Sequence, residues 1–244
     1  MAENWMSHMV EGEDGGVYAI LVDVAHAESM PDRRRPLWCM VQVPLKKPGD
    51  NGFGSDAERN TIFEMEDRYA ELVSKCGGVY VASIRGCGNI GVHVYVPAGA
   101  GEKVAAAAKK CFVGYQIECG DEPDPQWEQY KNILPSPEAA AAIADMQLIQ
   151  VLQENGDQNE KPRPVDHCIF VPRAKVEEAK ARAKAAGFAL TGTMDDDDPV
   201  GLILTLAHAV TPDEVATWRA RLGDIADSLG GEYDGWETVL VKKT

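Results

Sequence analysis

Four polar side chains lie within apolar, strand-like segments of the first half of the chain and could form a small binding or catalytic site. They are Asp23, Arg85, His93 and Tyr95. Together they would offer charged and proton-transferring groups to a ligand, provided that they converge on one face of a sheet. The pattern favours the simpler interpretation that this sheet face is open to solvent, because antiparallel sheets commonly leave one face wet.

Two histidines, His167 and His208, lie within apolar runs of the second half. Because side chains alternate along a strand, His167 shares a face with Ile169, and His208 shares one with Leu206. If these strands form a central antiparallel pair, the two imidazoles become neighbours. No third ligand for a metal is evident, so we expect hydrogen-bonded histidines and no metal or cofactor.

A run of four carboxylates, Asp195–Asp198, precedes Pro199. It lacks the alternating oxygen ligands and the distal glutamate of a calcium loop, so we interpret it as a solvated hairpin loop. The glycine-rich segment 86–91 joins two strands and does not open a helix, which favours a turn over a phosphate loop. No nucleophile motif is present, and we predict no catalytic residue.

The elements that would carry these residues follow one pattern in each half. In the second half we predict strand 165–171, helix 174–186, strands 188–194 and 200–210, helix 211–229 and strand 233–241. In the first half we predict strands 17–24, 37–45, 79–86, 90–97 and 115–119, with helices 56–76 and 102–111. Each half contains the order βαββαβ, which is typical of ferredoxin-like domains.

The sequence thus predicts an α+β protein of two ferredoxin-like sandwich units with antiparallel sheets, the first with an extra N-terminal strand. A further helix is predicted from Ser136 to about Glu154, and segment 156–164 has the polar, proline-containing composition of a linker. We therefore expect domains at 1–155 and 164–244.

Composition limits the classes of partner. The 244 residues are 45% hydrophobic and carry a net charge of −15. An acidic surface repels nucleic-acid phosphates and attracts basic proteins. No stretch approaches the roughly 20 apolar residues of a membrane helix, and the N-terminus lacks a secretion leader, so we expect a cytoplasmic protein without membrane contact. The six cysteines show no ligand spacing and are expected to be free thiols.

The last helix and strand carry the most specific pattern. Thr211, Pro212 and Glu214 supply a capping hydroxyl, a proline at the first helical position and a capping-box carboxylate. The helix is expected to stop at the pair Gly230-Gly231, and the segment Glu232-Tyr-Asp-Gly-Trp236 follows. Within it, Asp234-Gly235 could form a bulge while the aromatic side chains cap the core.

From residue 164 onward, this arrangement resembles the RraB family, small acidic bacterial proteins that regulate ribonuclease E. Residues 1–155 resemble a family of unknown function that occurs fused ahead of RraB-like domains. The matching features there are Trp5, Val22–Val24, Ile62–Asp67 and Trp127–Tyr130. Neither resemblance brings a catalytic residue with it.

The resemblance implies an acidic, non-enzymatic regulator that binds a basic region of a ribonuclease E-type enzyme and restrains it. The expected contact residues are Asp195, Asp196, Asp197, Asp198, Glu232, Tyr233, Asp234 and Trp236. Carboxylates would pair with arginines, and an aromatic ring would serve as anchor or only as packing. The alternatives are a small-molecule-binding or enzymatic first domain, and a homodimer formed through sheet faces or edges.

Overall fold

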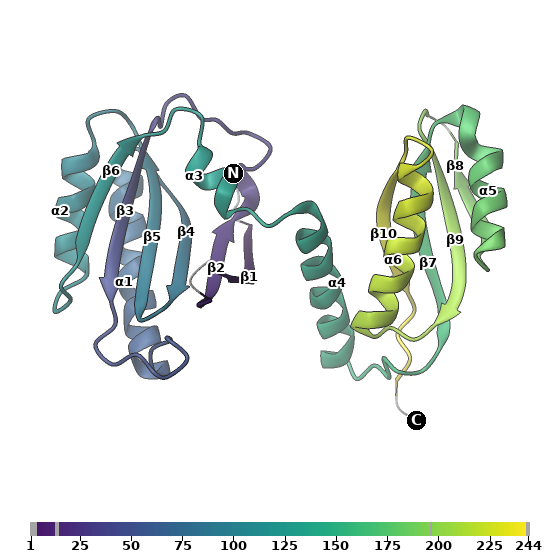
Figure 1. Ribbon diagram of the computed structural model, residues 1–244, viewed down its shortest axis with the longest axis horizontal. Helices are drawn as coiled ribbons and strands as arrows, with labels where there is room; N and C mark the ends of the chain where they lie inside the picture. Colours follow the sequence, from purple (N-terminus) through teal and green to yellow (C-terminus); the bar gives the residue numbers. More distant parts are fainter. Residues whose placement is uncertain (1–3, 13–14, 196, 243–244) are drawn as a thin grey trace. The chain divides into compact units, whose positions relative to one another are not determined.

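The computed structural model describes residues 4–12, 15–195 and 197–242, and the chain divides into two compact units between Ser136 and Pro137 (Figure 1). The limits expected from linker composition, 1–155 and 164–244, differ from this division by one helix, α4 (Pro137–Glu154). Contacts explain its place in the second unit. Its buried Ile149 packs against Val165, Val210 and Val215.

The first unit is built on an antiparallel sheet with the strand order β1-β2-β4-β5-β3-β6. Its elements are β1 (Trp5–Glu11), β2 (Val17–Asp23), β3 (Leu37–Pro44), α1 (Asp56–Lys75), β4 (Val79–Gly86), β5 (Asn89–Val96), α2 (Gly101–Cys111), β6 (Glu118–Pro123) and α3 (Glu128–Ile133), with a 3-10 turn at Val24–His26. The segment from β3 to β6 has the predicted βαββαβ order. Its N-terminal extension is a hairpin of two strands, whereas the sequence predicted only the second of them.

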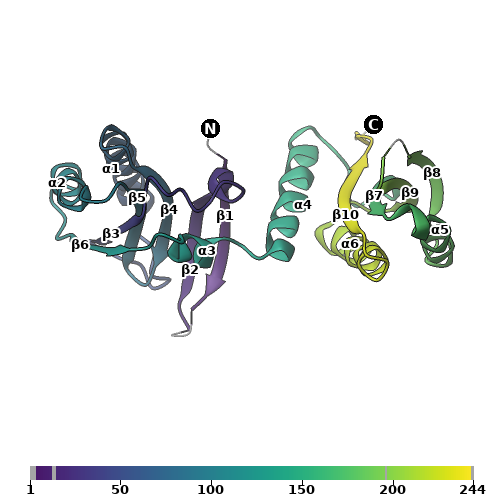
Figure 2. The ribbon, with the colours of Figure 1, turned by 90° about the horizontal axis from the view of Figure 1, so that it is seen from above.

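The helices of this unit cover the sheet unevenly. Helices α1 and α2 lie on one side, and α3 lies on the other (Figure 2). The first side buries alternate residues of β3 and β5, such as Val41 and Val94, against both helices. On the second side, fully buried Trp127 stacks on Tyr95 with ring centroids 4.1 Å apart. Because β1 and β2 extend the sheet beyond β4, they lie outside the four strands of the ferredoxin-like core.

The second unit is a four-stranded antiparallel sheet with the order β10-β7-β9-β8. Its elements are α4, β7 (Arg163–Val171), a 3-10 turn (Arg173–Lys175), α5 (Val176–Ala185), β8 (Ala189–Met194), β9 (Val200–His208), α6 (Pro212–Asp227) and β10 (Glu232–Thr238). This is the predicted ferredoxin-like topology. Both edge strands, β8 and β10, contain a register shift against their neighbours.

One side of the second sheet is buried beneath helices. Helices α5 and α6 lie on the same side of it (Figure 2). There, Ile169 and Leu202 pack against Ala183 and Leu222 of the two helices. The cap signals of α6 act as predicted, since the Thr211 hydroxyl accepts from the Glu214 amide and Pro212 is the first helical residue. The predicted start of this helix is therefore confirmed.

Candidate functional site

A bulge in β10 turns two aromatic side chains to the same side of the sheet. Tyr233 lies opposite Ile169 and Gly235 lies opposite Cys168, so Asp234 is an extra residue. Gly235 has a φ of +134°, a conformation that residues with a side chain rarely adopt. The predicted bulge at Asp234-Gly235 is thus confirmed. Without it, the rings of residues 233 and 236 would point to opposite faces.

Both aromatic rings face the helices. Tyr233 packs into the core beneath α5 and α6. The indole nitrogen of Trp236 donates to Asp145 Oδ1 of α4 over 2.7 Å, and its ring packs beside Ile149. Asp145 also pairs with Arg219 of α6 at 3.2 Å. The two rings therefore hold β10 against the rest of the unit, and a direct contact with a partner stays a prediction.

The two predicted neighbouring histidines do meet. His167 Nε2 and His208 Nε2 are 3.0 Å apart, and His167 Nδ1 is 2.9 Å from the Tyr233 hydroxyl. His208 Nδ1 is 2.7 Å from the Ala209 carbonyl, which can only accept, so this nitrogen carries a proton. Neutral His208 then accepts at Nε2 from His167, whose Nδ1 accepts from Tyr233. One tautomer of each ring satisfies the whole chain.

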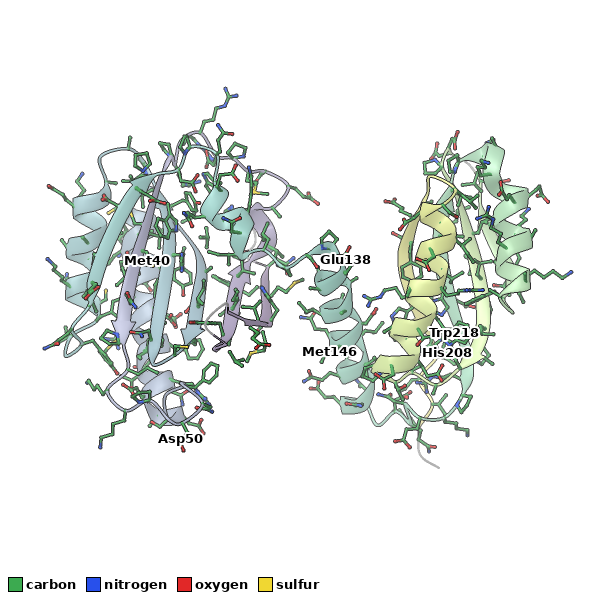
Figure 3. All side chains as sticks on the ribbon, viewed as in Figure 1. Met40, Asp50, Glu138, Met146, His208 and Trp218 are labelled. Carbon is green, nitrogen blue, oxygen red and sulfur yellow. The ribbon has the colours of Figure 1, made fainter. Side chains whose placement is uncertain are left out.

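Burial keeps these histidines neutral. The pKa of His167 is lowered to about 3, first by desolvation and then by its proximity to His208. Desolvation also lowers the pKa of His208, although the Ala209 carbonyl and Glu214 oppose this shift. His208 lies beside Trp218 in the same buried cluster (Figure 3). A hydrogen-bonded structural role, as predicted, accounts for these contacts.

The sheet face opposite the helices is uncovered and acidic. The strand register places Glu232 beside Phe170, and Glu237 beside Asp166. A hollow of about 320 Å³ lies on this face of the sheet. The side chains that line it on this face are three carboxylates, Asp166, Asp234 and Glu237, and three less polar groups, Cys168, Met194 and Ile203. No described lysine or arginine lines this hollow.

The acidic loop between β8 and β9 is exposed, as expected of a solvated hairpin. Asp196 lies outside the described residues. The guanidinium of Arg173 donates to the carbonyls of Asp195 at 2.6 Å and Asp197 at 3.2 Å. The Arg173 amide donates to Asp198 Oδ1 at 3.0 Å. Arg173 thus holds the loop by bonds to two backbone carbonyls of the loop and to the side chain of Asp198.

In the first unit, the four predicted polar residues do not form one cluster. Arg85 faces α1, where it pairs with Glu66. His93 and Tyr95 face the opposite side, where the Trp38 indole donates to His93 and the Tyr95 hydroxyl donates to Asp124 Oδ2 over 2.5 Å. Arg85, His93 and Tyr95 are buried, so the open, wet face that the sequence favoured does not describe them.

Asp23 is the last residue of β2, and its carboxylate binds backbone amides. Its Oδ1 accepts from the amides of Asn4 at 2.8 Å and Ala25 at 3.0 Å. The bond from Ala25 caps the 3-10 turn that follows the strand, and the bond from Asn4 ties Asp23 to the chain just before β1. Asp23 therefore has a structural role in the described part of the chain, and ligand binding by any of the four residues stays a prediction.

Glu66 is a buried charged residue that the sequence analysis missed. Its carboxylate accepts from Tyr80 at 3.3 Å and from Ser83 at 2.7 Å, and it pairs with Arg85. Burial raises the pKa of Glu66, against the lowering effects of Arg85 and the hydroxyl groups. A signal was available, because Glu66 falls on the buried stripe of α1 between Ile62 and Tyr69.

The described residues contain no group of three or more histidine, cysteine, aspartate or glutamate side chains that could hold a metal ion. Among the described helices, none is both long and apolar enough to cross a membrane.

The acid sensitivity of the second unit should depend on His167. Unfolded His167 takes a proton near pH 6.5, whereas the folded side chain does so only near pH 3. Between these values the unfolded state binds more protons, so stability falls as the pH falls, by up to about 1.4 kcal/mol per pH unit. Urea unfolding of His167→Gln from pH 7.5 to 4.5 should show a shallower acid loss than wild type. Parallel curves would contradict this expectation.

The Glu66–Arg85 pair should show strong coupling. Arg85→Met leaves a buried carboxylate without its charge partner and should destabilise the protein by roughly 3–5 kcal/mol. Adding Glu66→Gln removes that charge, so the double variant should be more stable than Arg85→Met alone. Urea unfolding at pH 7 measures all three variants, and simple additivity of the two losses would refute the coupling.

Two solved structures show remote similarity to the chain. One is titled "Crystal Structure of an Unknown Protein from Galdieria sulphuraria", with 12% identity, coverage of 84% of this chain and 99% of that chain, and a TM-score of 0.24. Another, titled as a hypothetical protein, has 11% identity, coverage of 98% and 100%, and a TM-score of 0.22. No curated protein matches the chain.

Family models match both units. The model described as "Regulator of ribonuclease activity B", the RraB family, matches residues 142–238. The model described as a "Family of unknown function (DUF695)" matches residues 3–135, more than half of the chain. Both resemblances noted in the sequence are thereby confirmed. The chain belongs to the DUF695 family and carries an RraB domain behind its DUF695 region.

Proposed function

We propose that this protein binds a basic region of a ribonuclease E-type enzyme and restrains its activity. The observation that carries the proposal is the match of residues 142–238 to the RraB family, whose description is regulation of ribonuclease activity. The acidic open face of the second sheet supplies a surface suited to a basic partner. The role is one of protein binding, without chemistry on the RNA.

The open face supports a more specific contact set. Glu232 and Asp234, expected from the sequence, lie on it together with Asp166 and Glu237. Apolar contact comes from Ile203 and its neighbours Cys168 and Met194. Tyr233 and Trp236 take the role of keeping β10 in place, because their rings face the helices.

An arginine side chain fits this combination. Its aliphatic stem would contact the less polar lining side chains, and its guanidinium would reach the neighbouring carboxylates in charge-assisted hydrogen bonds. The exposed carboxylates of Asp195, Asp197 and Asp198 would extend the negative field and speed association. Restraint follows by competition, since arginine-rich regions hold RNA through its phosphates and an acidic protein would occupy the same side chains.

The affinity for a purified ribonuclease E-type protein should depend on the open face. The triple variant Glu232→Gln, Asp234→Asn, Glu237→Gln should bind at least about tenfold more weakly at low salt, because each charge-assisted contact contributes roughly 1.5–3 kcal/mol. A matched control, Glu177→Gln, Asp224→Asn, Asp227→Asn, removes the same charge from exposed positions on α5 and α6. Isothermal titration calorimetry compares the affinities of the two triple variants at about 50 and 300 mM salt. The Debye length falls from roughly 14 to 6 Å between these conditions, so an electrostatic contribution should weaken.

Three results would contradict the proposal. Equal losses in the two triple variants would mean that only net charge matters. Binding that ignores salt would remove the electrostatic argument, and absence of binding by wild type would remove the partner. The competing hypothesis is that a second copy of this chain occupies the same face. Light scattering of the protein alone tests it by measuring the molar mass.

A further inference from the structure

A second cavity, in the first unit, has the opposite charge. It has a volume of about 390 Å³, within the range of small-molecule sites. Two arginines line it, and no described acidic residue does. The side chains that define it are Leu21, Asn51, Phe53, Arg59, Phe63 and Arg85. In a chain of net charge −15, a cavity lined only by positive charge selects for anions.

The topology explains why this cavity is open. Helices α1 and α2 pack over β3 and β5, and the β1-β2 hairpin continues the sheet past α1. The space on the helix side of the hairpin is then bounded by α1 and by the loop between β3 and α1. Apolar surface remains in water there, since Met9 is 59% exposed and Phe63 is 41% exposed. A ligand with an apolar body would cover this surface.

Arg85 offers a donor without a partner. Its side chain is 10% exposed, and its guanidinium lies over the Phe63 ring at 4.1 Å. One terminal nitrogen pairs with Glu66, while the buried Nε has no hydrogen-bond partner. An unsatisfied buried donor costs free energy, which an acceptor atom from a ligand would recover after a small side-chain adjustment.

Arg59 provides the accessible positive charge. It pairs with Asp56 on the same helix, but the Asp56 side chain is 88% exposed and does not line the cavity. Exposed pairs of this kind contribute little to stability, so exchanging Asp56 for a better-enclosed anion is inexpensive. From one charge and predominantly apolar walls, we infer that the cavity binds a small organic carboxylate whose body is aromatic or aliphatic.

The inference can be tested on the full chain with phenylacetate as probe and phenylacetamide as its neutral counterpart. Calorimetry should detect phenylacetate and give at least about tenfold weaker binding for the amide, since the amide lacks the negative charge that strengthens a hydrogen bond to a guanidinium. Arg59→Gln should weaken phenylacetate binding by a similar factor. Arg68→Gln is the matched control, because Arg68 lies on the same helix, pairs with Glu64 and does not line the cavity.

A filling variant tests the position of the site. Ala19 lines the cavity from β2, so Ala19→Trp should abolish phenylacetate binding while circular dichroism shows an intact fold. Equal effects of Arg59→Gln and Arg68→Gln, equal affinity for acid and amide, or no binding by wild type would each overturn the inference. Binding of the ribonuclease partner by Arg59→Gln should be unchanged, so this test is independent of the proposed function.

Discussion

A helix is about 10 Å wide and neighbouring strands lie about 4.8 Å apart, so two helices cover one side of about four strands. This limit determines where both units leave surface exposed. In the first unit, six strands share two helices on one side of the sheet, so the space beside α1 is bounded by the β1-β2 hairpin without a third helix. In the second unit, α5 and α6 both lie on one face, and the other face meets solvent. The same packing rule thus yields a positively lined cavity in one unit and a negatively lined hollow in the other.

Buried polar groups are the second organising feature, because a polar group without a partner is costly where water is excluded. Glu66 gathers two hydroxyl groups and a guanidinium, and Tyr95 and Asp124 connect the sheet to α3. His167 and His208 connect β7 to β9, and the Ala209 carbonyl sets which ring nitrogens carry protons. These networks restrict the registers that the strands can adopt, since a slip of one residue would leave several donors unpaired.

Sequence patterns predicted the elements that have strong local signals and missed those that tertiary contacts create. Capping residues located α6, and alternating apolar residues located the central strands. Strand β6 is exposed along its whole length, so no apolar pattern fixed its position. Helix α3 has only six residues, and the Asp124 carboxylate accepts from two of its first amides. The Trp236 ring faces the helices because of the bulge in β10. The alternation of side chains along a regular strand would predict the opposite face.

The register shifts in β8 and β10 have a consequence for assembly. A sheet edge offers a row of unpaired amide and carbonyl groups on which another chain can add a strand, and an irregular edge interrupts that row. Both edges of the second sheet carry such an irregularity. Growth of this sheet from its edges, whether into a continuous dimer or into an aggregate, is therefore disfavoured. The second unit can thus expose an uncovered sheet face and still resist self-association by strand addition.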